Sequence, residues 1–201
     1  MKKVISILIL FALISVGAFA IDFSGGGGLM LELTGNKADD GRLRVFNYGG
    51  FVFLDAEYAE LDVTFSYGSI TTWDEDGAKS EDAGNVVQLG FSLMGKLPIN
   101  VAFITVFPLL GINYSVILDF DDDDVTVDLG DYIVEWLSQF GVVAGAGVDL
   151  SLSRQLYLRS SILFNLRFPD GFFKGLSDSV SDIKTTLGVG SRLQVGVGYR
   201  F

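Results

Sequence analysis

The chain has 201 residues, of which 49% are hydrophobic, and it carries 25 acidic against 14 basic side chains. The net charge of −11 excludes nucleic acid as a partner, and the length predicts a single domain. Because the sequence contains neither His nor Cys, it also excludes a disulfide framework and any Ser-His or Cys-His nucleophile. We therefore expect a non-enzymatic protein without a cofactor.

The first twenty residues have the pattern of a secretory signal peptide. Lys2 and Lys3 form a positive start, residues 4–16 are apolar, and residues 18–20 form a small-x-small cleavage site. The apolar stretch is shorter than the roughly 20 residues that a membrane-spanning helix needs. The sequence therefore predicts an exported chain that loses residues 1–20 and keeps residues 21–201 as its barrel domain.

Alternation of apolar and polar residues with a period of two runs through most of the remaining chain and predicts β-strands. In the segment 58–72, for example, Leu61 and Phe65 alternate with Glu60 and Asp62. The phase is blurred at residues 47–50, where we expect a β-bulge. The eight predicted strands cover residues 23–34, 42–54, 58–72, 85–95, 101–118, 140–151, 156–168 and 184–201.

The predicted connections alternate in length, which is typical of an antiparallel transmembrane β-barrel. Tight turns are expected near Ala56 and at residues 97–100 and 152–155. Longer, mostly acidic loops are expected at residues 35–41, 73–84, 119–139 and 169–183. A soluble lipocalin-like barrel would show the same alternation, with the apolar face turned inward. The signal peptide and the loop asymmetry favour an all-β, eight-stranded barrel in the bacterial outer membrane, with both termini on the periplasmic side.

Charged residues within the strands share the polar parity and are predicted to point into the lumen. An Arg facing lipid costs about 2–4 kcal/mol at the bilayer midplane, so inward Arg side chains need carboxylate partners. Glycines of the segments 140–151 and 184–201 face the same way, which leaves two interpretations open: a plugged lumen or a narrow conduit. The predicted lumen charge network comprises Glu32, Arg44, Glu60, Asp62, Asp149, Arg159, Arg167, Arg192 and Arg200.

The third long loop contains the acidic run at residues 119–124. Carboxylates are ligands for Ca²⁺, but the spacing does not fit an EF-hand, and a solvated acidic loop is the favoured interpretation. After this run, Tyr132 and Trp136 recur at helical spacing and predict a short amphipathic helix over residues 131–139. We therefore predict no metal site.

The last strand ends in the pattern Gln194-x-Gly196-x-x-Tyr199-x-Phe201. This pattern resembles the C-terminal signal that the barrel assembly machinery recognises. The chain as a whole resembles the small eight-stranded outer-membrane barrels of the OmpA-transmembrane-domain, OmpX and OmpW type, and is similar to small spirochaete-type outer-membrane barrels. The resemblance implies contact with outer-membrane lipid and with the assembly machinery during biogenesis.

Two roles remain open from the sequence. The first is a structural or surface-contact protein whose acidic extracellular loops meet a surface ligand. The second, implied by the resemblance to OmpW, is a narrow passive channel for small or hydrophobic solutes. Catalysis by lumen carboxylates such as Glu60, Asp62 or Asp149 is the less favoured interpretation, because such acids usually serve as partners of Arg.

Overall fold

The computed structural model describes residues 22–38, 41–73, 79–80, 84–121, 139–168 and 188–201. The predicted signal peptide lies outside these residues, as do most of the loops at 119–139 and 169–183. The helix predicted over 131–139 also lies outside them, apart from Gln139, which begins a strand. Within the described residues, no helix is long and apolar enough to cross a membrane.

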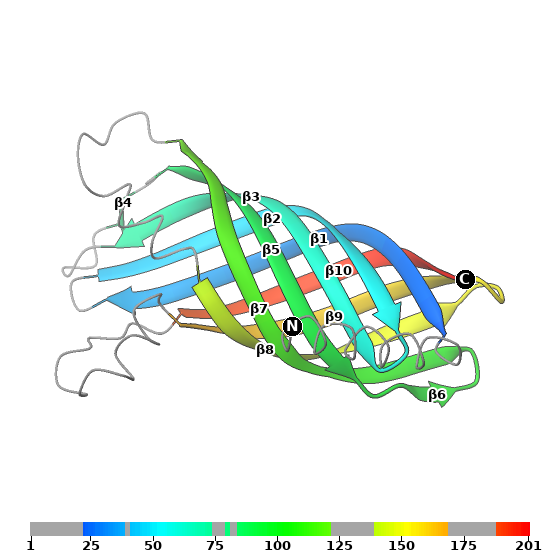
Figure 1. Ribbon diagram of the computed structural model, residues 1–201. Helices are drawn as coiled ribbons and strands as arrows, with labels where there is room; N and C mark the ends of the chain where they lie inside the picture. Colours follow the sequence, from blue (N-terminus) through cyan, green and yellow to red (C-terminus); the bar gives the residue numbers. More distant parts are fainter. Residues whose placement is uncertain (1–21, 39–40, 74–78, 81–83, 122–138, 169–187) are drawn as a thin grey trace, which may run out of the picture.

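Eight long antiparallel strands form a closed barrel (Figure 1), which confirms the predicted fold class. Each pairs with its neighbours in the ring, and β1 closes the ring by pairing with both β2 and β10. Two short strands are added, β4 (Lys79–Ser80) against β3 and β6 (Ile99–Val101) against β7. The eight long strands are β1 (Phe23–Ala38), β2 (Gly41–Ala56), β3 (Ala59–Trp73), β5 (Asn85–Lys96), β7 (Ile104–Asp121), β8 (Gln139–Ser151), β9 (Leu156–Phe168) and β10 (Gly188–Arg200).

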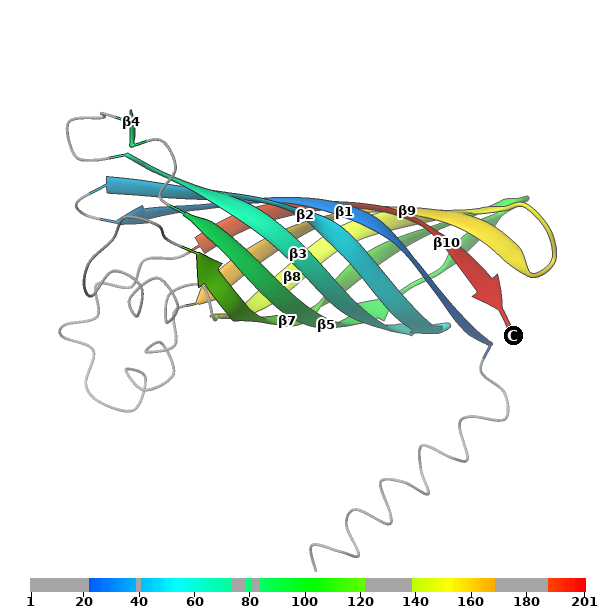
Figure 2. The same cartoon turned by 90° about the horizontal axis from the view of Figure 1, so that it is seen from above.

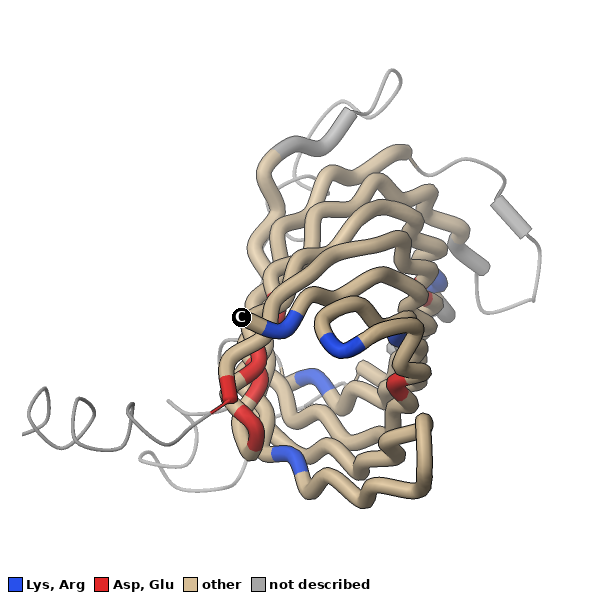
Figure 3. The backbone as a smooth tube through the Cα atoms, turned by 90° about the vertical axis from the view of Figure 1, so that its right-hand side faces the viewer, with Lys and Arg blue, Asp and Glu red and all other residues tan. Residues whose placement is uncertain are grey.

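Both ends of the described chain lie at one end of the barrel, here called the terminal end (Figures 1 and 2). The backbone N–H of Phe201 donates a hydrogen bond of 3.0 Å to the carbonyl of Phe23 there. Figure 3 looks along the barrel from this end and shows the ring that the strands make around the lumen. The opposite end carries the connections β1–β2, β3–β5, β7–β8 and β9–β10 and is called the loop end.

Two predicted connections are wrong. The predicted loop at residues 35–41 is largely strand, because Ala38 pairs with Gly41 and only residues 39–40 separate β1 from β2. The predicted tight turn at 97–100 is also misplaced. β6 keeps the register of β5 against β7, so the hairpin continues to Ala102 and Phe103. Pro98 interrupts the strand without ending the hairpin, because a proline lacks the N–H that a ladder needs.

The predicted bulge at residues 47–50 is wrong as well. β2 keeps one continuous register with β1 and with β3, and the register shift in the barrel lies between Val87 and Gln88, where β5 pairs with β7. The sequence phase blurs in β2 for a different reason. Phe51 and Phe53 point into the lumen and are buried, so this part of the strand is apolar on both faces.

The outer surface of the barrel is apolar, and the lumen holds most of its charge. Leu29 is 76% exposed and Leu110 is 64% exposed, whereas Arg159 and Arg167 are each 1% exposed. An apolar face turned outward fits a lipid bilayer and contradicts the lipocalin-like alternative, which would bury its apolar face in the barrel. The alternation predicted for β3, β5, β9 and β10 is confirmed by this arrangement.

Candidate functional site

The lumen near the terminal end is organised around the guanidinium of Arg159 on β9. It binds Asp149 of β8 with two nitrogens, Nε and Nη2, each 2.7 Å from a carboxylate oxygen. Nη1 donates to Glu60 at 2.5 Å and Nη2 to Asp55 at 2.6 Å. Asp55 also forms an ion pair with Lys96. Since a buried charge is costly without partners, the three carboxylates and two cations stabilise one another.

Three aromatic rings enclose the Arg159 guanidinium. Its Cζ lies 4.2 Å from the ring centroid of Phe53, 5.0 Å from that of Phe107 and 5.4 Å from that of Tyr157. Cations over ring faces are attracted by the ring quadrupole, more strongly where water is excluded. The charge cluster and its three aromatic neighbours are therefore packed together inside the lumen at this level.

Sequence reasoning missed two members of this cluster, Asp55 and Lys96. Both were placed at or beyond the predicted strand ends, and the structure extends β2 and β5 to include them. The alternation of β5 could have identified Lys96, because Lys96 lies on the same strand face as Ser92 and Met94. Continuing the alternation by one residue would have placed it in the lumen.

A second charge cluster lies nearer the loop end, around Glu32 of β1. Arg192 donates from Nε at 3.1 Å and from Nη2 at 3.0 Å to Oε2, and Arg167 forms an ion pair with Oε1. Asn165 adds a hydrogen bond of 3.2 Å to Oε1. Here two guanidinium groups surround one carboxylate, whereas in the Arg159 cluster three carboxylates surround one guanidinium.

Between the two clusters, Asp62 lies close to neutral partners. Its Oδ2 accepts a hydrogen bond of 3.0 Å from Gln194, whose own Oε1 accepts one of 2.8 Å from Ser161. Arg200 lies at the terminal end of the lumen, only partly buried. It donates to Ser151 Oγ at 3.1 Å and lies 4.7 Å from the centroid of the Tyr157 ring.

The prediction that Arg44 points into the lumen is wrong. Arg44 is exposed on the outer face of β2, near the loop end, because its neighbour Val45 takes the inward position. The inward side of β2 carries Val45, Phe51 and Phe53, so polarity does not identify the lumen face of this strand. An outward Arg near the end of a strand lies where the penalty for charge in the bilayer is small.

An apolar cluster occupies the lumen at the loop end. Val45, Ile70 and Val86 are buried against one another, with Leu43 and Ile117 packed beside them. These side chains come from four neighbouring strands, β2, β3, β5 and β7. The described lumen is therefore bounded by an apolar layer towards the loops and by the Arg159 cluster towards the termini.

The section between these boundaries contains polar atoms that lack a hydrogen-bond partner among the described residues. Buried polar groups in folded proteins are almost always satisfied, by protein or by ordered water. Ordered water is the usual partner of such groups. The atoms are Asn47 Oδ1, Asp62 Oδ1, Gln88 Nε2, Asn113 Oδ1, Asn165 Oδ1, Arg167 Nε and Arg192 Nη1.

The residues of the C-terminal pattern are divided between the two faces of β10. Gln194 and Gly196 are buried in the lumen wall, and Tyr199 and Phe201 lie outside. The two aromatic rings meet edge to face with centroids 5.7 Å apart. They form an exposed aromatic pair at the terminal end of the outer surface.

Within the described part of the chain, no group of three or more Asp or Glu side chains is arranged to hold a metal ion. Asp55, Glu60 and Asp149 converge, but Arg159 occupies the position between them. Each of the three carboxylates accepts a hydrogen bond from the Arg159 guanidinium. The arrangement suits structural charge pairing.

Comparison with known proteins gives a match in structure alone. No family model and no curated protein matches the chain. Among solved structures, OprG from Pseudomonas aeruginosa superposes with a TM-score of 0.52 at 14% identity, covering 90% of this chain and 96% of OprG. The fold is that of the small outer-membrane barrels. Neisserial surface protein A (TM-score 0.50, 9% identity, 89% and 97% covered) and the outer-membrane protein AlkL (0.50, 9%, 90% and 90%) share it.

Proposed function

We propose that this chain is a non-enzymatic outer-membrane barrel with a closed lumen, acting as a structural or surface-contact protein. The proposal rests on the charged, aromatic and apolar side chains that pack inside the lumen at two levels. The Arg159 cluster and its three aromatic rings occupy the terminal end, and the Val45–Ile70–Val86 cluster occupies the loop end. An eight-stranded barrel is just wide enough for its side chains to fill it, so such layers suffice to block passage.

Export and insertion are proposed to depend on two segments of the sequence. Residues 1–20 act as a cleaved signal peptide, and the barrel then meets outer-membrane lipid through its apolar exterior. Gln194, Gly196, Tyr199 and Phe201 serve as the signal for the assembly machinery. The exposed aromatic pair Tyr199–Phe201 supports this role, because both rings are accessible on the outer surface of the barrel.

The proposal of a non-enzymatic protein is supported by the pairing of the lumen carboxylates with arginine side chains. Asp55, Glu60 and Asp149 each accept a hydrogen bond from Arg159, and Glu32 is shared by Arg167 and Arg192. A general acid or base needs a titrating group that reaches substrate. These groups are paired and enclosed.

The surface-contact role rests on the charge of the loop segments. The connections at the loop end contain the runs Asp74–Glu75–Asp76 and Asp122–Asp123–Asp124, so the sequence of that end is strongly negative. Clustered negative charge speeds the association of cationic partners, and this effect weakens as ionic strength rises. We propose a basic surface ligand for these loops.

A narrow passive channel is the second candidate, favoured by one observation. Among the described residues, the polar section between the two boundaries holds seven buried polar atoms without a hydrogen-bond partner, a setting in which internal water is usual. Passage would require the Arg159 cluster and the apolar cluster to open.

Planar-bilayer recording of the refolded protein distinguishes the two candidates. We expect no reproducible conductance steps from the native barrel. Arg159→Ala should allow steps by removing the centre of the charged cluster, whereas Arg154→Ala, an exposed residue of the β8–β9 turn, should stay silent. Steady steps from the native protein that change in size on replacing Arg192 would overturn the closed-lumen proposal in favour of a channel.

A further inference from the structure

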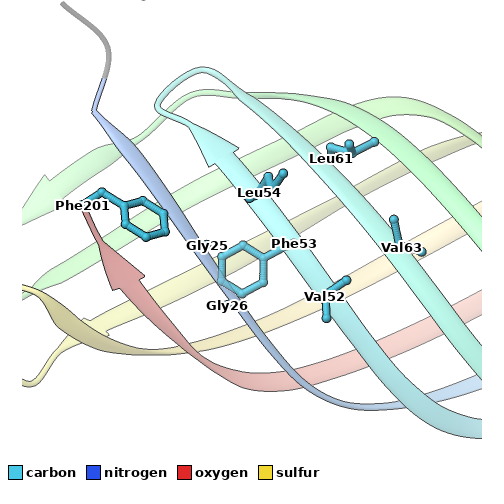
Figure 4. Close-up of a pocket in the computed structure, with 8 residues that line it drawn as sticks. All are labelled: Gly25, Gly26, Val52, Phe53, Leu54, Leu61, Val63 and Phe201. Carbon is cyan, nitrogen blue, oxygen red and sulfur yellow. The ribbon is translucent and has the colours of Figure 1, made fainter.

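A pocket of about 320 Å³ opens on the outer surface of the barrel near the terminal end (Figure 4). Val52 and Leu54 of β2 and Leu61 and Val63 of β3 form its walls. Their side chains lie on the apolar face that the barrel turns outward. The pocket therefore opens outward, and its lining also includes Gly26 and Phe53, the residue whose ring contacts Arg159 in the lumen.

Missing side chains on β1 create this depression. Gly25 has the outward parity of Leu29, and a Cβ built on it would lie 3.2 Å from Leu54 Cδ2 and 3.7 Å from Phe201 Cε2. The Phe201 ring thus forms one edge of the pocket beside a bare stretch of backbone, as Figure 4 shows. The Phe201 N–H bond to Phe23 holds this edge in place.

We propose that this pocket binds an acyl chain of a phospholipid with an ammonium headgroup, in the leaflet that surrounds the terminal end. The pocket is continuous with the outer apolar surface, where Leu29 and Leu54 are 76% and 60% exposed, so hydrocarbon is the medium that meets it. An acyl chain that lies in the depression contacts apolar walls on several sides, whereas on a flat barrel surface it contacts one side only. The inference rests on the bilayer location and is independent of whether the lumen is closed.

Two carboxylates that are close in sequence to pocket residues select the headgroup. Asp22 precedes β1 and is exposed, and Glu57 lies in the β2–β3 turn directly after the strand that supplies Leu54. The nearest cation on β10, Arg200, turns into the lumen towards Ser151 and Tyr157. The rim is therefore negative, and it favours a lipid with an ammonium group over a lipid with net negative charge.

Photo-crosslinking from the pocket wall tests the inference. A benzophenone amino acid is placed at Leu61, and a matched one at Leu110, an outward position on β7 with 64% exposure. The protein is refolded in vesicles of equal parts phosphatidylethanolamine and phosphatidylglycerol, and adducts are identified by mass. We expect about two- to fivefold enrichment of phosphatidylethanolamine at Leu61, the size of one interfacial charge contact, and none at Leu110.

Two sets of variants separate the pocket from the headgroup rim. Gly25→Val fills the depression and should return the ratio at Leu61 to the vesicle composition, while Gly95→Val, on an exposed glycine of β5, should not. Asp22→Asn combined with Glu57→Gln should also abolish the preference while the pocket still yields lipid adducts. Urea midpoints check that each variant folds.

The vesicle ratio at Leu61 in the native protein, or enrichment of phosphatidylglycerol there, would overturn the inference. Adducts between two copies of the chain at Leu61 would also overturn it, by making a second barrel the occupant. Neither result depends on conductance. Failure of the lipid inference would therefore leave the closed-lumen proposal intact, since planar-bilayer recording tests that proposal separately.

Discussion

The Tyr157 ring lies across Gly198, its direct cross-strand partner on β10, so closely that a Cβ on the glycine would collide with the ring. Phe107 lies over Gly147 in the same way. Phe53 lies against Gly26, where a Cβ would also meet the backbone of Val197, and each pair again consists of direct partners in the sheet. The three rings are those that enclose Arg159. Cross-strand glycines thus give the aromatic walls of the charge cluster the space that they need.

Replacing Gly198 by Ala is expected to destabilise the barrel by about 1–3 kcal/mol, the usual cost of overpacking a core. Tyr157 cannot move freely, because its hydroxyl is hydrogen-bonded to Ser24 at 2.8 Å and its ring contacts Arg159 and Arg200. Urea unfolding in lipid vesicles measures the change. Gly50→Ala is the control, since the nearest atom to its Cβ is 3.5 Å away. Equal losses for both variants would contradict the account.

Replacing Arg159 by Met is expected to cost about 3–5 kcal/mol, because it leaves three carboxylates in the lumen with Lys96 as the remaining cation of that cluster. Arg154→Met, at an exposed position in the β8–β9 turn, should change the unfolding free energy by less than about 0.5 kcal/mol.

A second variant checks that charge is the cause of this loss. Adding Glu60→Gln to Arg159→Met removes one of the uncompensated carboxylates and should recover part of the stability. A double variant that is less stable than Arg159→Met would indicate that lost packing outweighs charge.

Replacing Phe201 by Ala is expected to reduce the amount of barrel in the outer membrane of cells more than it lowers stability. The ring is 82% exposed, and the backbone hydrogen bond to Phe23 remains after the substitution, so refolding in detergent should persist with a change in unfolding free energy of about 1 kcal/mol or less. Phe103→Ala is the matched control, an aromatic of 60% exposure at the same end. Unchanged membrane levels for Phe201→Ala would remove the assembly-signal proposal.

Replacing Ala102 by Gly is expected to stabilise the β6–β7 hairpin by about 0.5–1 kcal/mol. Ala102 has a φ of 54°, in the left-handed region that disfavours residues with a Cβ. The same change at Ala146, in the middle of β8, should destabilise the barrel, because glycine in a strand interior loses more chain entropy on folding. The two urea midpoints should move in opposite directions, and a fall at both positions would contradict the strain at Ala102.

The fold itself could be predicted from the sequence, because alternation with a period of two is a local property of a strand. Leu61 and Glu60 face opposite ways in any extended chain, and the prediction for β3 is confirmed. β2 was the exception. Its inward Phe51 and Phe53 are as apolar as its outward residues. The predicted bulge and the predicted inward position of Arg44 were wrong for that reason.

The sequence by itself determined how the residues of β3, β5, β9 and β10 divide between two faces, because neighbouring side chains on one strand point opposite ways. The signal peptide and the loop asymmetry then favoured lipid as the medium of the apolar face. Only the tertiary structure decided which charges meet. Arg159 and Glu60 are 99 positions apart, and Arg192 and Glu32 are 160 apart. Their contacts depend on the tilt and register with which the strands close the ring, and these are set by all eight strands together.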